Sequence, residues 1–184
     1  MTDARLSLLA GLTIAVGLLV DRFGGAWGQP LVSLWAWGVC GLLMWRERAW
    51  RPRLVACLVI ATAGELVLSL VWGLYDYRLG NLPLFVPPGH VLLYWLGLQW
   101  ADRLPERLFS LTPWLALAAV SAFALSRLDW LGPPLLLVFL ACVRWGPAPR
   151  LYMTMFLLSL VMELWGTALG NWAWRSTLPG LGWP

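Results

Sequence analysis

The sequence predicts an all-α, polytopic integral membrane protein, a bundle of about seven transmembrane helices. Of its 184 residues, 60% are hydrophobic and 12% are charged, and the mean hydropathy is +0.73. A soluble domain carries about a quarter charged residues and cannot bury so much apolar surface in so short a chain. Apolar runs also recur along the whole chain. We therefore expect one transmembrane domain over residues 1–184.

Seven apolar runs, bounded by clusters of Arg, Pro and Gly, have the length and composition of candidate spans. They are Leu6–Val20, Leu31–Trp45, Leu54–Leu74, His90–Trp100, Leu108–Ser126, Leu131–Val143 and Leu151–Trp172. The fourth and sixth runs are short, and Pro133 and Pro134 open the sixth, so a count of six spans stays open.

The arginines predict the orientation of the spans. All basic residues are Arg, and a cytoplasmic N-terminus places nine of the 13 on the cytoplasmic side. These nine are Arg5, Arg46, Arg48, Arg51, Arg53, Arg103, Arg107, Arg144 and Arg150, whereas Arg22, Arg78, Arg127 and Arg175 fall outside. Such a bias is typical of multi-pass proteins, here of the cell (inner) membrane. It accounts for the basic composition without a nucleic-acid partner.

Composition also excludes several chemistries. Without lysine the chain cannot form a Schiff base. Its single histidine excludes a bis-His haem and a multi-His metal site. Cys40, Cys57 and Cys142 are scattered singly, which indicates neither a disulfide framework nor a thiolate site. We expect no cofactor and no metal.

Two glutamates and the only histidine are the candidate catalytic residues. Glu65 and Glu163 lie inside apolar spans, where an ionisable side chain is costly and marks a functional site by default. Glu65 is twelve residues from Arg53, and Glu163 and His90 are each thirteen residues from Arg150 and Arg103, respectively. At ~1.5 Å per residue, all three lie ~18–20 Å from the cytoplasmic end. We expect one site that opens to the outer side.

Helical spacing extends this site into two polar stripes. One stripe is Glu65, Ser69, Trp72 and Asp76, and the other is Ser159, Glu163, Thr167, Gly170 and Trp174. The two stretches share a Glu, a Trp-Gly, a Gly-Asn and a Leu-Pro, but the offset is 98 for the glutamates and 90 for the Gly-Asn pairs. This partial similarity between the two stretches does not by itself establish a duplication.

Aromatic and polar residues around the stripes are the candidate substrate-binding residues. They are Trp72, Tyr75, Asp76, Tyr77, Asn81, Tyr94, Trp165, Asn171, Trp172 and Arg175. Structural alternatives stay open: a membrane Glu can bond a neighbouring helix, Asp76 can pair with Arg78 or Arg175, and both tyrosines suit an aromatic belt.

A proton donor in an apolar cavity lined by Trp suits carbon–carbon double bonds, because aromatic faces stabilise the resulting cation without attacking it. The chain is thus expected to be a membrane enzyme acting on an isoprenoid-type lipid by acid/base chemistry. A small proton- or cation-coupled transporter and a non-catalytic membrane subunit are the alternatives. The expected partner is a membrane lipid or lipid-soluble molecule, and a protein partner or homo-oligomer stays open.

One stretch resembles a known family. Glu65, then Tyr75-x-Tyr77-x-Leu79-Gly80, then Pro83 and Pro87 resemble the membrane-embedded hydratases of carotenoid biosynthesis. The resemblance covers residues 65–90, and the Glu-to-Tyr spacing is shorter here than in that family. It implies a hydratase, whereas the protonation chemistry described above would equally suit an isomerase or a cyclase of isoprenoids. The inventory of Glu, His, Asn and Trp is also similar to that of emopamil-binding-type sterol isomerases, as chemistry only.

Overall fold

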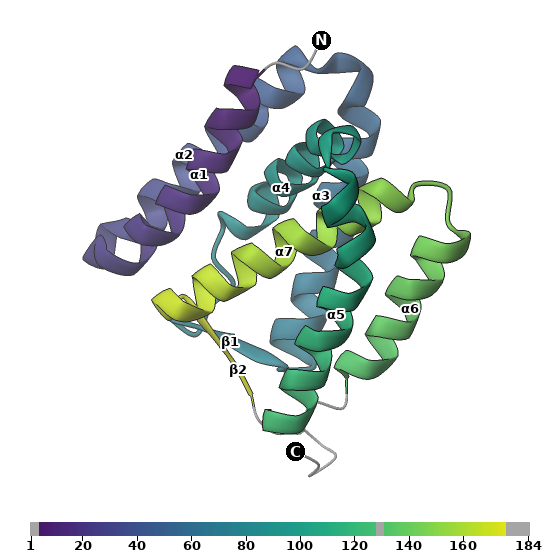
Figure 1. The fold of residues 1–184 in the computed structure, drawn as a ribbon. Helices are drawn as coiled ribbons and strands as arrows, with labels where there is room; N and C mark the ends of the chain where they lie inside the picture. The colour runs from purple at the N-terminus through teal and green to yellow at the C-terminus, as the bar shows by residue number, and fades with distance from the viewer. Residues whose placement is uncertain (1–3, 128–130, 176–184) are drawn as a thin grey trace. The chain divides into compact units, whose positions relative to one another are not determined.

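The computed structural model describes residues 4–127 and 131–175 (Figure 1). In order, the helices and strands are α1 (Ala4–Phe23), α2 (Gly25–Arg46), α3 (Arg51–Glu65), β1 (Tyr75–Tyr77), α4 (Val86–Trp100), α5 (Glu106–Arg127), α6 (Gly132–Trp145), α7 (Pro149–Leu169) and β2 (Trp172–Trp174). A π-helical stretch over Leu66–Val71, called the π segment below, continues α3. Short 3₁₀ turns, Arg48–Trp50 and Ala101–Arg103, precede α3 and follow α4.

Within the described residues, four helical segments are long and apolar enough to cross a bilayer. They are Ala4–Phe23, Arg48–Val71, Glu106–Leu125 and Pro149–Leu169. The helix α6 is apolar but shorter. The exposed surfaces of the helices are rich in large apolar side chains, as expected for helices surrounded by lipid rather than by water. The described chain is therefore all-helical apart from two three-residue strands, and four of its helical segments suit a membrane.

Each predicted span contains a helix, but several predicted ends are wrong. The second helix begins at Gly25, six residues before the predicted Leu31. In the third run the regular α-helix ends at Glu65. The seventh helix ends at Leu169, and Trp172, the predicted end of that span, lies in a strand. The fourth helix begins four residues before His90, because Pro87 and Pro88 occupy its first turn, where backbone N–H groups need no intrahelical partner.

The described chain forms two compact units. The first contains the residues up to Leu96 together with Val161–Arg175, and the second runs from Gly97 to Leu160. In the second unit, α5 packs on α6. There Arg150 pairs with Glu106 at 2.5 Å and lies over the Phe109 ring. All residues of the candidate site belong to the first unit.

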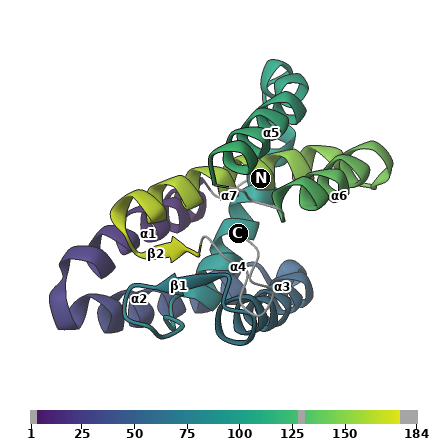
Figure 2. The same cartoon turned by 90° about the horizontal axis from the view of Figure 1, so that it is seen from below.

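The first unit begins with a tight helical hairpin of α1 and α2, which lie side by side (Figure 1, Figure 2). Gly24 separates the helices, and Gly25 has a φ of +59° that other residues rarely adopt. A Cβ atom on Gly28 would lie 2.4 Å from the backbone oxygen of Val20. Small residues at this corner therefore allow the two helices to approach closely.

Replacing Gly28 tests this corner. Gly28→Ala is expected to destabilise the protein by about 1–3 kcal/mol, because its methyl group would overlap a backbone carbonyl that cannot move without opening the hairpin. The measurement is thermal unfolding in detergent micelles. Gly38→Ala on the same helix is the control: its Cβ meets nothing within 4 Å, so it should be neutral or stabilising by up to about 1 kcal/mol. Equal effects of the two variants would contradict the close approach.

Candidate functional site

A two-stranded antiparallel sheet joins the segments that follow α3 and α7. Tyr75 pairs with Trp174 and Tyr77 with Trp172, around the central pair of Asp76 and Ala173. Because residues directly opposite each other share a face, both tyrosines and both tryptophans lie on one face of the sheet. The sequence predicted none of this pairing. The segments that follow α3 and α7, the two helices that carry the glutamates, therefore meet at one place.

The Glu65 carboxylate accepts hydrogen bonds from both tyrosines. The hydroxyl groups of Tyr75 and Tyr77 both donate to Oε2 of Glu65, the second at 2.7 Å. The Glu65 side chain is only 12% exposed. The two phenols, predicted as substrate-binding or belt residues, are thus the partners of this carboxyl group.

The second oxygen of Glu65 faces the only histidine. Nε2 of His90 lies 3.4 Å from Oε1 of Glu65, and Nδ1 of His90 lies 3.0 Å from the carbonyl oxygen of Val86. A carbonyl can only accept, so Nδ1 carries a hydrogen. The Glu65 carboxyl group and the His90 ring are therefore close enough to form an ion pair whenever the ring is protonated.

Glu163 has a different set of partners. Its Oε1 accepts hydrogen bonds from Thr167 (3.0 Å) and from the indole N–H groups of Trp172 (2.7 Å) and Trp174. Three donors supply hydrogens to one oxygen, while Oε2 has no hydrogen bond within the described residues. In contrast to Glu65, Glu163 faces no titratable partner among these bonds.

Aromatic rings connect the two carboxyl groups. The ring centroids of Tyr75 and Trp174 are 5.0 Å apart, and those of Tyr77 and Trp172 are 6.3 Å apart. The indole of Trp172 also covers Gly166, where a Cβ atom would lie 2.0 Å from the ring. The lack of a side chain at Gly166 therefore leaves room for this ring. The sheet holds Glu65, His90 and Glu163 around one aromatic face.

Burial keeps the phenols protonated. Burial is the largest cause that raises the pKa of Tyr75 and of Tyr77, and the hydrogen bonds and negative charge of Glu65 raise the pKa values further. Both side chains are more than nine-tenths buried. The tyrosines therefore act at neutral pH as hydrogen-bond donors and not as bases.

An ion pair covers the opposite face of the sheet. The Arg175 guanidinium donates two hydrogen bonds to the Asp76 carboxylate, at 2.7 and 2.6 Å. The hydrogen bond and charge of Arg175 hold the pKa of Asp76 below its usual range. Asp76 and Arg175, predicted as substrate-binding residues, thus lie on the face away from the glutamates. The surface ion pair, one of the alternatives, is the arrangement found.

A buried polar cluster, which the sequence analysis missed, anchors the sheet to α1. Asp21, 2% exposed, accepts hydrogen bonds from Arg78 at 3.2 Å and Asn171 at 2.6 Å. Asn171 was predicted to bind substrate, but its side-chain amide donates its hydrogen bonds within this cluster. The signal for Asp21 is an acidic residue at the end of an apolar run.

The remaining predicted substrate-binding residues make no hydrogen bond to Glu65 or Glu163 within the described structure. Trp165 donates to the carbonyl of Ala15 at 3.2 Å, and Trp72 is 37% exposed at the end of the π segment. Tyr94 lies on α4 and makes no hydrogen bond within the part of the chain that is described. Neither predicted stripe is a continuous helical one, because Asp76 and Trp174 lie on strands.

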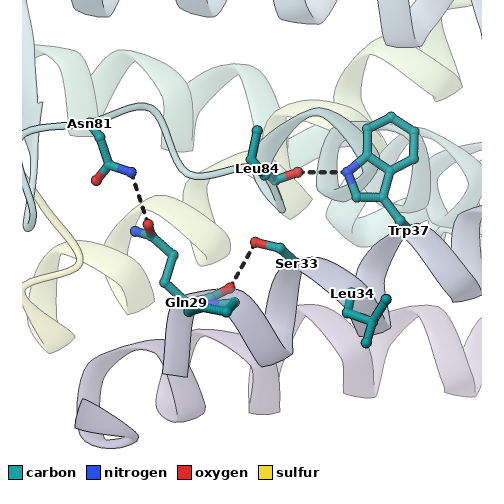
Figure 3. Close-up of a pocket in the computed structure, with 7 residues that line it drawn as sticks. Gln29, Ser33, Leu34, Trp37, Asn81 and Leu84 are labelled. Carbon is teal, nitrogen blue, oxygen red and sulfur yellow. Dashed lines mark hydrogen bonds between the residues drawn. The ribbon is translucent and has the colours of Figure 1, made fainter. Parts of the chain in front are cut away.

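Asn81 belongs to a different feature, an open and mainly apolar groove between α2 and the loop before α4. Figure 3 shows Asn81 bonded to Gln29 at 2.9 Å and the Trp37 indole bonded to the carbonyl oxygen of Leu84 at 2.9 Å. The groove has a volume of about 550 Å³ and is also lined by Pro30, Ser33 and Leu34. Asn81 is thus not brought to Glu65.

The α3–β1 and α7–β2 segments repeat one plan. The amide of Arg78 donates to the carbonyl of Asn171 and the amide of Arg175 to that of Leu74, at 2.8 and 2.9 Å. Gly73 and Gly170, with φ of +70° and +74°, precede the strands at equivalent positions. The equivalence found here is therefore Gly73 with Gly170, whereas the Gly-Asn pairs noted in the sequence are not equivalent.

Residues 4–127 and 131–175 contain no group of three or more His, Cys, Asp or Glu side chains placed to hold a metal ion. Comparison of the chain with protein-family models, curated proteins and solved structures gave no match. The site therefore has to be interpreted from its own geometry.

The hydrogen bond from Tyr77 to Glu65 can be tested by stability. Tyr77→Phe should destabilise the protein by about 1.5–3 kcal/mol, because a half-buried carboxyl group loses a donor. In a Glu65→Gln background the same change should cost less, since the two residues are coupled. Tyr94→Phe is the control and should change the unfolding free energy by less than about 0.5 kcal/mol. Additive effects of the two site variants would contradict the interaction.

The Asp76–Arg175 pair predicts a pH dependence. Because the pKa of Asp76 is lowered in the folded protein, its stabilisation is present above the unfolded pKa of about 3.9 and is lost as pH falls through the lower, folded value. The melting temperature of Asp76→Asn should therefore be below that of the wild type at neutral pH, by a small margin for this exposed pair. The two melting curves should converge as the pH falls below the folded pKa of Asp76. A difference that persists there would argue against the pair.

Proposed function

We propose that this protein is an integral membrane enzyme that acts on a lipid-soluble, isoprenoid-type alkene by acid/base chemistry. The observation that carries the proposal is the 3.4 Å approach of His90 Nε2 to Glu65 Oε1, with His90 Nδ1 facing the carbonyl oxygen of Val86. General acid catalysis needs a proton held within reach of substrate by a group that can later take one back. A proton held between Glu65 and His90 would meet both needs, and Glu65 lies in a segment of the required apolar character.

The proposed reaction starts with transfer of a proton from the Glu65–His90 pair to one carbon of a double bond. A C–H bond forms, the π bond breaks, and its other carbon becomes a carbocation. Water can then add and return a proton to the pair, or an adjacent C–H can lose its proton to the pair. Alternatively, a second double bond can close a ring, and the new carbocation then loses a proton to the pair. These endings correspond to a hydratase, an isomerase and a cyclase, respectively. The aromatic faces around the sheet suit the cationic stage.

Glu163 would contribute a negative charge that stabilises the carbocation. Asp21, Asp76 and Glu106 are each paired with an arginine, whereas the contacts of Glu163 are with neutral donors only. A carboxylate without a cationic partner attracts positive charge that develops nearby. Glu163 is therefore proposed as an electrostatic group and Glu65–His90 as the acid.

The proposed placement has seven spans, a cytoplasmic N-terminus and the sheet at the outer end of α3 and α7 in the inner membrane. The antiparallel pairing supports it, because it brings the segments after α3 and α7 to one side, as the arginine bias predicts.

A proton-coupled transporter is the second candidate. It is favoured by the repeated plan of α3–β1 and α7–β2 and by the interruption of α3 beside Glu65, since transporters are often built from repeats with broken helices at the coupling site. In this reading the Glu65–His90 pair carries the coupling proton and no lipid is altered.

Glutamine variants separate these candidates. Glu65→Gln and His90→Gln keep side-chain size but remove one of the two groups proposed to hold the proton. The rate of substrate conversion should therefore fall by about 100-fold or more. The measurement is untargeted lipid analysis of cells that carry or lack each variant, with accumulation of substrate expected. Glu106→Gln, in the second unit, is the control and should retain wild-type lipids.

The outcomes differ for each function. Wild-type lipid profiles in both glutamine variants, with folding intact, would rule out the acid mechanism. Loss of pH-dependent uptake with unchanged lipids would indicate the transporter, and no change in either would indicate a non-catalytic subunit.

A further inference from the structure

The two glutamate-bearing segments have the same parts in the same order. In each, a helix carries the glutamate, a glycine with positive φ follows, and a strand then returns two aromatic donors to that same glutamate. The reciprocal bonds of Arg78 and Arg175 fix the strand residues as equivalents. The segments can therefore be compared position by position.

The comparison shows one extra residue in the first segment. Trp172 follows Tyr75 by 97 positions, but Glu163 follows Glu65 by 98. At the end of α7 the amide of Asn171 bonds to Gly166, five residues back, whereas the equivalent amide of Leu74 bonds to Leu68, six residues back. The extra residue thus lies in or directly after the π segment, and a π-helical turn is how a helix accommodates one inserted residue.

The insertion changes what the carboxyl group can reach. In α7, Thr167 is four residues after Glu163 and donates to it. Ser69 is likewise four residues after Glu65, but it lies in the π segment and makes no hydrogen bond to Glu65 in the described structure. A wider turn rotates the residue four positions on away from the helix face that it would otherwise share. Oε1 of Glu65 therefore faces His90 and not a hydroxyl group of its own helix.

We propose that the extra residue in the π segment positions Glu65 for His90, so that Glu65 and not Glu163 is the carboxyl group that exchanges protons. The inference rests on the proposed function for its catalytic meaning, but its geometry can be tested without a substrate. Val71, 81% exposed, is the residue whose removal disturbs packing least. Its deletion would give the first segment the spacing of the second.

The test uses the single histidine as a reporter. The full chain is labelled with ¹⁵N-histidine in lipid nanodiscs, and the Nε2 resonance is recorded for the wild type and for Glu65→Gln. Deletion of Val71 should move this resonance to the position seen in Glu65→Gln, whereas Val71→Ala, which keeps the spacing, should leave it at the wild-type position. Glu163→Gln should also leave it unchanged, with Thr167→Val as the substitute if that variant does not fold.

Several results would overturn the proposal. One is a folded deletion variant with the wild-type His90 resonance, and another is a shift of that resonance in Glu163→Gln or Thr167→Val. Deletion of Leu70 provides a second version of the shortened segment. If neither deletion variant folds, the proposal also fails, because the second segment folds with that spacing. Expected resonances together with unchanged lipids in Glu65→Gln would refute only the proposed function.

Discussion

The structure of the site depends on how two carboxyl groups in apolar helices obtain hydrogen-bond donors. A buried polar group without a partner costs several kcal/mol in apolar surroundings, and water is not available there to replace one. The β1–β2 sheet supplies four donors from one face, two phenols to Glu65 and two indoles to Glu163. The sheet is only three residue pairs long, so it is itself held by the Asp21 cluster beneath it and by the Asp76–Arg175 pair on its other face.

The distribution of charge separates structural from chemical residues. Asp21 and Asp76 each meet an arginine, which compensates their charge and fixes backbone segments relative to one another. Glu65 and Glu163 instead meet neutral donors and one histidine. A carboxylate held in this way keeps its capacity to respond to a proton or to positive charge, because its partners are dipoles and not a permanent counter-ion. This difference, more than depth in the membrane, distinguishes the two glutamates from the other paired acidic residues.

The two glutamates have similar supports but different surroundings. Glu65 faces a histidine from α4, the helix that follows β1. Glu163 receives a third donor from its own helix. A single inserted residue is enough for this divergence, since a turn wider than an α-helical one changes which side chains share a helix face. A repeated scaffold can thus present one carboxyl group that faces a histidine and another that has three donors on one oxygen.

The sequence by itself determined the apolar, helical character of the chain and the approximate positions of its helices, and it marked Glu65, Glu163 and His90 as candidates, because composition, helical period and the cost of an ionisable group in lipid are local properties. Only the tertiary structure decided that residues 75–77 pair with 172–174, that Tyr75, Tyr77, Trp172 and Trp174 are donors to the glutamates, and that Asp76 faces away. Strand pairs of three residues have no periodic signal that can be read, and their partners lie almost a hundred positions apart. The chain had to be folded before those side chains could meet.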